Sequence, residues 1–238
     1  MAQCAHRGDA GGNPAAHGAD AGLAGVRMVS APDKNEEVAA FVTDPRRSIA
    51  QIRGRTPRER LRETLWEIIG QPLMRLTFHN WYGIRRRLLN LFGADIHPTA
   101  RVRPTARISH PWRLTVGAHT AIGDHAILFC LGAISIGSRC TISQYAHLCA
   151  GGHDYTRKDM PLISDPIIIE DDVWIAADVF VGPGVRIEED TVVGARSTVI
   201  HSLPPRSVCA GDSAKAIRTR EVSSVVAAGA AGARDDAS

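Results

Sequence analysis

Residues 169–204 read IEDDVW-IAADVF-VGPGVR-IEEDTV-VGARST-VIHSLP, which is six consecutive blocks of six residues without a slip. Every block opens with Ile or Val, and most blocks have a small or β-branched residue in the fifth place. A fixed period of six is typical of a parallel β-helix in which three short strands close one triangular coil. The first residue of each block would point into the prism, so the stretch predicts a mainly β solenoid.

The same aliphatic spacing extends upstream to residue 96 and predicts five coils. The expected inward residues are Ile96, Val102 and Ile108; Val116, Ile122 and Leu128; Ile136, Ile142 and Leu148; Ile169, Ile175 and Val181; and Ile187, Val193 and Val199. The first two coils are each slightly longer than three blocks, so extra residues lie near Pro111-Trp112 and near Leu131-Gly132. The start of the fourth coil is delayed by about 15 residues, which predicts a loop insertion at 151–166, and such loops often carry function.

The rest of the chain flanks this solenoid. We expect a disordered N-terminal region at 1–55, a helical cap at 56–93, the solenoid at 94–204, a C-terminal extension at 205–220 and a disordered tail at 221–238. Thr56-Pro57 with Glu59 is a helix start, and apolar residues then recur at helical spacing until Pro72 breaks or kinks the helix. A second apolar run ends at Gly93, which can cap it. The extension predicts a strand, a turn and a helix.

Composition narrows the class of protein. The 238 residues are 44% hydrophobic but only 5% aromatic, which suits a narrow prism without room for rings. A net charge of +3 is too small to indicate nucleic acid. The five cysteines have neither metal-ligand spacing nor an even framework, which favours a reduced, cytoplasmic protein. No apolar run is long enough to span a membrane, and the first residues lack the apolar core of a signal peptide.

Several motifs accompany the repeats. They are GGHDYTRKDMP, WIAADVFVGPGV, VVGARSTVI and SLPPRSVCAGDSAKAIR. Together these stretches resemble the hexapeptide-repeat acyltransferases, and LFGADIHPTARVRP makes the chain similar to the colanic acid biosynthesis O-acetyltransferases over roughly residues 60–220. The resemblance implies a left-handed parallel β-helix, a homotrimer with active sites between subunits, and acetyl-CoA as co-substrate without a metal. We therefore expect an O-acetyltransferase that acts on a hydroxyl of a sugar or of an exopolysaccharide precursor.

His153 matches the catalytic histidine of that family. An alcohol must lose its proton as it attacks a thioester, and imidazole suits the general-base role near neutral pH. Because coenzyme A thiolate is a good leaving group, we expect direct transfer without a covalent enzyme intermediate. Asp154 and Tyr155 follow at once, and three interpretations are open: they orient His153, they contact the acceptor, or they belong to a plain polar loop. The family's other acceptor residues have no recognisable counterparts near Ala126.

The resemblance also implies contacts to coenzyme A. They fall on Trp174, Ala177, Gly194, Ala195, Lys215 and Arg218. The first four positions would let the thin pantetheine arm lie against the coils, and the two basic side chains would meet the nucleotide phosphates. Ser213 stands where the family usually has a proline, so the turn before Lys215 can be looser here.

Three other functions remain open on sequence. An N-acetyltransferase acting on an amino sugar is the nearest. A zinc enzyme like the hexapeptide carbonic anhydrases would need converging histidines, and the pairs His119/His125 and His147/His153 are each six apart. The family's zinc enzymes have a more closely spaced pair. A non-enzymatic trimeric scaffold would not bind acetyl-CoA.

The cap carries a further hypothesis. Arg85, Arg86 and Arg87 stand in a row beside Trp81 and Leu88. A cap needs an apolar inner side to cover the open coil, but it does not need three adjacent arginines. If the acceptor is lipid-linked, a basic outer face would hold the enzyme weakly and peripherally at the inner membrane surface.

Overall fold

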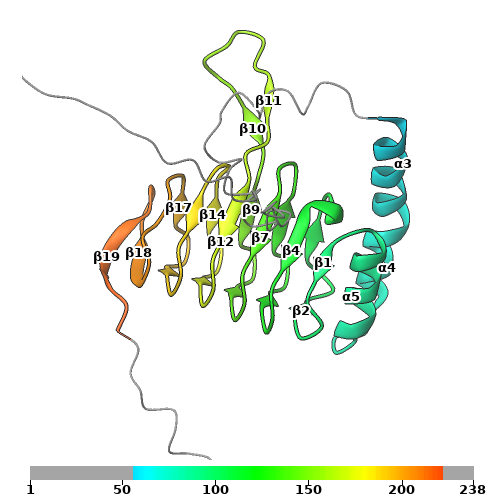
Figure 1. Ribbon diagram of the computed structural model, residues 1–238, viewed down its shortest axis with the longest axis horizontal. Coiled ribbons are helices and arrows are strands. Elements are labelled where there is room, and N and C mark those ends of the chain that lie inside the picture. Colours follow the sequence, from blue (N-terminus) through cyan, green and yellow to red (C-terminus); the bar gives the residue numbers. More distant parts are fainter. Residues whose placement is uncertain (1–55, 222–238) are drawn as a thin grey trace, which may run out of the picture.

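The structure is a computed structural model that describes residues 56–221, so the predictions for 1–55 and 222–238 lie outside the described residues. Four helical segments come first: α3 (Pro57–Leu65), the π-helix η1 (Trp66–Gly70), α4 (Gln71–Leu76) and α5 (Tyr82–Leu91). A three-sided solenoid of short parallel strands follows, and the helices cover its first coil (Figure 1). The predicted mainly β solenoid with a helical N-terminal cap is therefore confirmed.

Each wall of the prism is one sheet. The first sheet holds β1 (Asp95–Ile96), β4 (Leu114–Val116), β7 (Ile134–Ile136), β12 (Ile167–Ile169) and β15 (Arg186–Ile187). The second holds β2 (Arg101–Val102), β5 (Ala121–Ile122), β8 (Thr141–Ile142), β13 (Trp174–Ile175), β16 (Val192–Val193), β18 (Ser207–Ala210) and β19 (Lys215–Thr219). The third holds β3 (Arg107–Ile108), β6 (Ile127–Phe129), β9 (His147–Cys149), β14 (Phe180–Val181) and β17 (Thr198–Val199).

The inward residues stack as the spacing predicts. Ile136 of β7 pairs with Ile169 of β12, although the whole insertion separates them in sequence, and Ile169 pairs in turn with Ile187. All fifteen predicted inward residues are buried. Because β7 and β12 pair directly, the insertion leaves the coil without disturbing the stack. The extra residues of the first coil form the short 3₁₀ helix η2 (Pro111–Arg113).

The corners use a backbone conformation that is uncommon for side-chain-bearing residues. His125, Tyr145, Asp178 and Arg196 occupy the same corner of successive coils, each with φ close to +60°. The amide of Tyr145 donates to the carbonyl of Asp124, and that of Asp178 donates to Gln144, so stacking hydrogen bonds support each turn. This ladder brings side chains that are distant in sequence into one column on the surface.

The cap is anchored by a few buried side chains. The helix start predicted at Thr56-Pro57 is confirmed, and the Thr56 hydroxyl and the Glu59 carboxylate form a capping box there. Trp66 packs edge-on against Phe92, and its indole N–H donates to the carbonyl of Ile108 in the first coil. Pro72 neither breaks nor ends the helix. The π-helix η1 directly before it changes the hydrogen-bond register, and this accommodates the missing N–H of proline.

The prediction that Arg85, Arg86 and Arg87 all lie on the outer face of the cap is wrong for Arg85. Its side chain is fully buried and donates hydrogen bonds to the carbonyls of Val102, Phe78 and His79 at 2.6–2.8 Å and to the Thr77 hydroxyl at 2.7 Å. Burial lowers the pKa of the guanidinium from its ordinary value. Arg85 therefore ties the α4–α5 loop to the first coil and is not available to a membrane.

The C-terminal extension also differs from the sequence prediction. β18 continues the second sheet, and β19 turns back to pair with it in antiparallel fashion, so a second strand stands where a helix was expected. The extended backbone completes the last coil edge, whereas a helix would leave the β18 edge unpaired. Within residues 56–221, no helix is long and apolar enough to cross a membrane.

Candidate active site

The insertion forms a hairpin that stands out from the solenoid (Figure 1). Its strands are β10 (Gly152–His153) and β11 (Leu162–Ile163), paired antiparallel with His153 opposite Leu162. The ring nitrogen Nδ1 of His153 lies 2.7 Å from the carbonyl oxygen of Met160. A carbonyl can only accept, so Nδ1 carries a proton, and in the neutral ring Nε2 then has the lone pair. The exposed imidazole is therefore held in the tautomer that can take up a proton at Nε2.

The two residues after His153 have different surroundings. The Asp154 carboxylate accepts from the amide and the hydroxyl of Thr156, at 3.0 and 2.5 Å, so it stabilises the hairpin tip. Tyr155 is exposed at that tip. The hydrogen-bond partner of the His153 ring is therefore the backbone of Met160 and not the Asp154 carboxylate.

The structure brings the expected coenzyme contacts onto one wall. Trp174 lies in β13 and Ala177 in the corner after it, while Gly194 and Ala195 follow β16 in the next coil. β13, β16, β18 and β19 are successive neighbours in the second sheet, and β19 carries Lys215 and Arg218, both exposed. The six positions form a path that runs from the basic edge strand to the half-exposed indole of Trp174.

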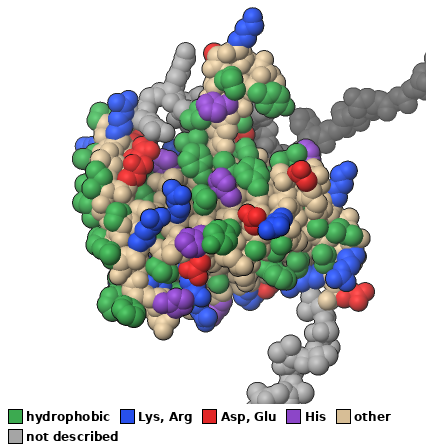
Figure 2. Space-filling model, turned by 180° about the vertical axis from the view of Figure 1, so that it is seen from behind, with side chains coloured by type: hydrophobic (Ala, Val, Ile, Leu, Met, Phe, Trp, Pro, Cys, Tyr) green, Lys and Arg blue, Asp and Glu red, His purple; other side chains and the backbone are tan. Residues whose placement is uncertain are grey.

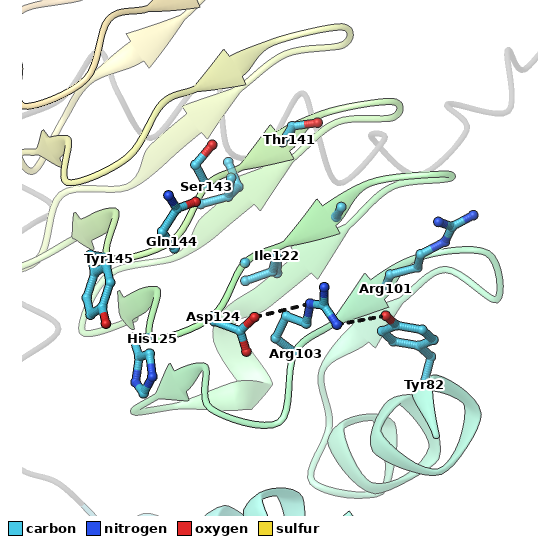
Figure 3. Close-up of a pocket in the computed structure, with 13 residues that line it drawn as sticks. Tyr82, Arg101, Arg103, Ile122, Asp124, His125, Thr141, Ser143, Gln144 and Tyr145 are labelled. Carbon is cyan, nitrogen blue, oxygen red and sulfur yellow. Dashed lines mark hydrogen bonds and ion pairs between the residues drawn. The ribbon is translucent and has the colours of Figure 1, made fainter. Parts of the chain in front are cut away.

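A pocket of about 450 Å³ lies on the same wall at its other end. Its lining comes from β2, β5, β8, the corners that follow β5 and β8, and α5 of the cap (Figure 3). Trp174 joins the two regions, because its indole N–H donates to the hydroxyl of Ser143 at 3.0 Å, and Ser143 lines the pocket. The path of expected coenzyme contacts therefore leads to the pocket.

The interior of the pocket combines charge, hydrogen-bonding groups and a flat ring surface. Arg103 lies 3.4 Å from the Asp124 carboxylate and 3.3 Å from the Tyr82 hydroxyl (Figure 3). The rings of His125 and Tyr145 stack nearly parallel, with centroids 5.1 Å apart. A polar cavity with an aromatic surface can bind the hydroxyls and the C–H faces of a sugar.

These pocket residues were not recognised from sequence. His125 and Tyr145 hold equivalent places in two successive early coils, so the coil register could have placed them in one corner. Tyr82 belongs to the cap, and no repeat spacing connects it to β5.

The histidines considered for zinc lie in different places. His119 and His125 occupy different corners, and His147 lies in β9 with its ring edge-on to Phe180. Burial lowers the pKa of His147. Within residues 56–221, no group of three or more His, Cys, Asp or Glu side chains is arranged to hold a metal ion.

Comparison with known proteins agrees with the fold. Residues 166–201 match the family model described as bacterial transferase hexapeptide (six repeats). The chain is 46% identical over 139 residues to the protein named "Putative colanic acid biosynthesis acetyltransferase WcaF" of Escherichia coli (strain K12), covering 58% of this chain and 76% of the relative. It is 29% identical to the galactoside O-acetyltransferase of the same organism, over 56% of this chain and 68% of that protein.

A solved structure is also similar. A hexapeptide-repeat-containing acetyltransferase from Vibrio cholerae O1 biovar eltor, crystallised with acetyl coenzyme A, superposes with a TM-score of 0.63 at 25% identity. The superposition covers 71% of this chain and 92% of that one.

Proposed function

Since this chain belongs to the hexapeptide-repeat acetyltransferases, we propose that it transfers the acetyl group of acetyl-CoA to a hydroxyl of a sugar or a polysaccharide precursor. The observation that carries this proposal is the state of His153, whose Nδ1–H is held by the Met160 carbonyl while Nε2 stays free. The names of the relatives, which include a colanic acid biosynthesis acetyltransferase and a galactoside O-acetyltransferase, support a sugar acceptor. We place the reaction in the cytoplasm.

Coenzyme A lies along the second sheet in this proposal. Lys215 and Arg218 bind the nucleotide phosphates, and the pantetheine arm passes the small side chains of Ala177 and Ala195. The thioester then reaches the neighbourhood of Trp174, whose hydrogen bond to Ser143 marks the border of the pocket. The order of strands in the sheet supports this direction.

The acceptor occupies the pocket between β2, β5 and β8. The stacked rings of His125 and Tyr145 contact the sugar face, and Gln144, Asp124 and Arg101 offer hydrogen bonds to its hydroxyls. This assignment supplies acceptor contacts that the sequence does not reveal.

A homotrimer completes the site. His153 does not line the pocket of its own chain, and its hairpin leaves the solenoid between β9 of the third sheet and β12 of the first. The pocket lies on the second sheet. A hairpin from a neighbouring subunit would bring its imidazole to the pocket and its Tyr155 over the acceptor, so each site would combine surfaces of two chains.

The chemistry then needs one proton shuttle. Nε2 of His153 takes the proton of the acceptor hydroxyl while the oxygen attacks the thioester carbon. The tetrahedral intermediate collapses by breaking the C–S bond, and the imidazolium returns the proton to the leaving thiolate. The products are the acetyl ester and coenzyme A, and His153 is neutral again.

The test is release of coenzyme A thiol from acetyl-CoA with nucleotide sugars, oligosaccharides, lipid-linked sugars and amino sugars as acceptors. We expect a hydroxyl acceptor to be acetylated, and His153→Ala to lower turnover by about 10²–10⁴-fold with acetyl-CoA binding retained. Wild-type turnover in that variant would remove His153 from the mechanism. Selective acetylation of an amine would favour the N-acetyltransferase, and failure to bind acetyl-CoA would favour a scaffold.

A further inference from the structure

The outer surface of the helical cap exposes an unusual number of large apolar side chains. Of the 17 large hydrophobic residues exposed in the described chain, ten lie between residues 61 and 91. We call these ten the cap face: Leu61, Leu65, Ile68, Ile69, Leu73, Leu76, Phe78, Trp81, Ile84 and Leu91. Hydrophobic side chains line the edge of the molecule formed by the cap in Figure 2. A clustered apolar surface of this kind marks an interaction site.

Covering the solenoid does not explain this surface. Trp66, Gly70 and Met74 face the first coil and are buried. Leu61, Leu65 and the other apolar residues of α3, η1 and α4 recur at a spacing of three or four on the opposite, exposed side. The helices are thus apolar on both sides, and only the inner side is used within the chain.

The α4–α5 loop adds a protruding aromatic pair. Phe78 and Trp81 have ring centroids 5.9 Å apart and remain 74% and 52% exposed. The hydrogen bonds from Arg85 to the carbonyls of Phe78 and His79 hold this loop in place. Exposed aromatic side chains on a fixed loop suit the boundary between lipid headgroups and acyl chains.

The charges of the cap identify the kind of surface that fits. Its basic residues outside the buried contacts are Arg58, Arg60, Arg75 and Arg87, which are exposed, and Arg86, which is half-buried. None of their side chains makes a hydrogen bond or an ion pair within residues 56–221. The acidic side chains of the cap are Glu59, which forms the capping box, Glu63, which lies 3.2 Å from His110, and Glu67, which is exposed. An apolar face bordered by excess arginine complements an anionic lipid surface.

We propose that the cap face binds an anionic lipid bilayer, with its apolar side chains at the headgroup–acyl boundary and the five arginines at the lipid phosphates. Tyr82 of α5 lines the acceptor pocket, so docking the cap places that pocket beside the bilayer. The acceptor is then a sugar carried on a lipid anchor in the same membrane. Only this last step rests on the proposed acetyl transfer.

The experiment uses the full chain with vesicles of phosphatidylglycerol and phosphatidylcholine, compared with phosphatidylcholine alone, in a flotation assay. We expect binding to the anionic vesicles at low salt and loss of binding at high salt. Phe78→Ser combined with Trp81→Ser lowers partitioning at least about tenfold. Arg86→Gln and Arg87→Gln each lower it about fivefold. Ile200→Ser, which removes an exposed apolar side chain far along the chain, is the matched control and binds like the wild type.

Several outcomes overturn the proposal. They are absence of binding to anionic vesicles at low salt, equal binding to both vesicle types, and unchanged binding of the Phe78/Trp81 double variant. If the wild type ignores vesicles while the double variant sediments as a smaller oligomer, a second copy of the chain covers the cap face instead.

Catalytic assays separate this inference from the proposed function. The double variant keeps turnover of a soluble acceptor and loses turnover of a vesicle-anchored one. If the wild type binds vesicles but transfers no acetyl group, the proposed function is wrong and the proposal that the cap face binds a bilayer is still supported. Equal turnover of the vesicle-anchored acceptor by the wild type and the double variant would defeat the link between them.

Discussion

Replacing Arg85 with leucine tests whether the cap is held by one buried cation. The guanidinium donates four hydrogen bonds, to the carbonyls of Val102, Phe78 and His79 and to the Thr77 hydroxyl. Leucine would leave these acceptors without their donor in a site that solvent reaches poorly. Bonds from a charged donor contribute about 1.5–3 kcal/mol each but are not additive, so we expect a loss of about 3–5 kcal/mol in unfolding free energy.

Urea unfolding monitored by tryptophan fluorescence measures this loss, because Trp66 and Trp81 both lie in the cap. Arg87→Leu is the matched control, since Arg87 is exposed on the same helix, and it should change stability by less than about 0.5 kcal/mol. The loss for Arg85→Leu should persist between about pH 6 and 9, because the guanidinium stays protonated there. A loss below about 1 kcal/mol would refute the anchoring role, and an equal effect of Arg87→Leu would show that the two arginines are equivalent.

Two further predictions concern titrating groups. The hydrogen bond from Arg139 holds the pKa of the Asp172 carboxyl below its ordinary value of 3.8. Because the folded pKa is depressed, the stabilisation is complete above the ordinary value and is lost as the pH falls through the folded value. Arg139→Gln should therefore cost below about 1 kcal/mol near pH 7 and progressively less as the pH falls below 3.8. A cost that grows at low pH would contradict the pairing. Burial raises the pKa of the Cys130 thiol to about 12, so iodoacetamide at about pH 8 should label this thiol only when urea unfolds the protein. Peptide mass measures the labelling. Rapid labelling of the native protein would contradict the burial of Cys130.

The repeat predicted the solenoid well because its constraint is local. A residue that points into a narrow prism must be aliphatic in every coil, so Ile136 and Ile169 could be paired across the insertion by counting alone. The pocket could not be found in this way. It combines side chains of three coils with Tyr82 of the cap, and outward positions carry no periodic requirement.

The orientation of His153 and the burial of Arg85 both depend on contacts with backbone carbonyls, which the sequence does not reveal. The group that orients His153 is a backbone carbonyl, and any residue at position 160 would supply one. Arg85 looked like the first member of a surface run, because a charged side chain is rarely fully buried unless its donors find partners. The carbonyls that satisfy it come from a loop and from the first coil, which only the folded chain brings together.

Strand stacking also fixes distances along the solenoid, because each wall advances by one strand spacing per coil. Four steps along the second sheet separate β8, at the pocket, from β19, which bears Lys215 and Arg218. At about 4.8 Å a step, the span is roughly 19 Å. Loops and side chains can vary freely, but this span can change only by whole coils. A homologue with one coil more or fewer between β8 and β19 would shift the phosphate-binding residues relative to the pocket by one strand spacing. On the proposed coenzyme path, the number of coils therefore determines whether the thioester reaches the pocket.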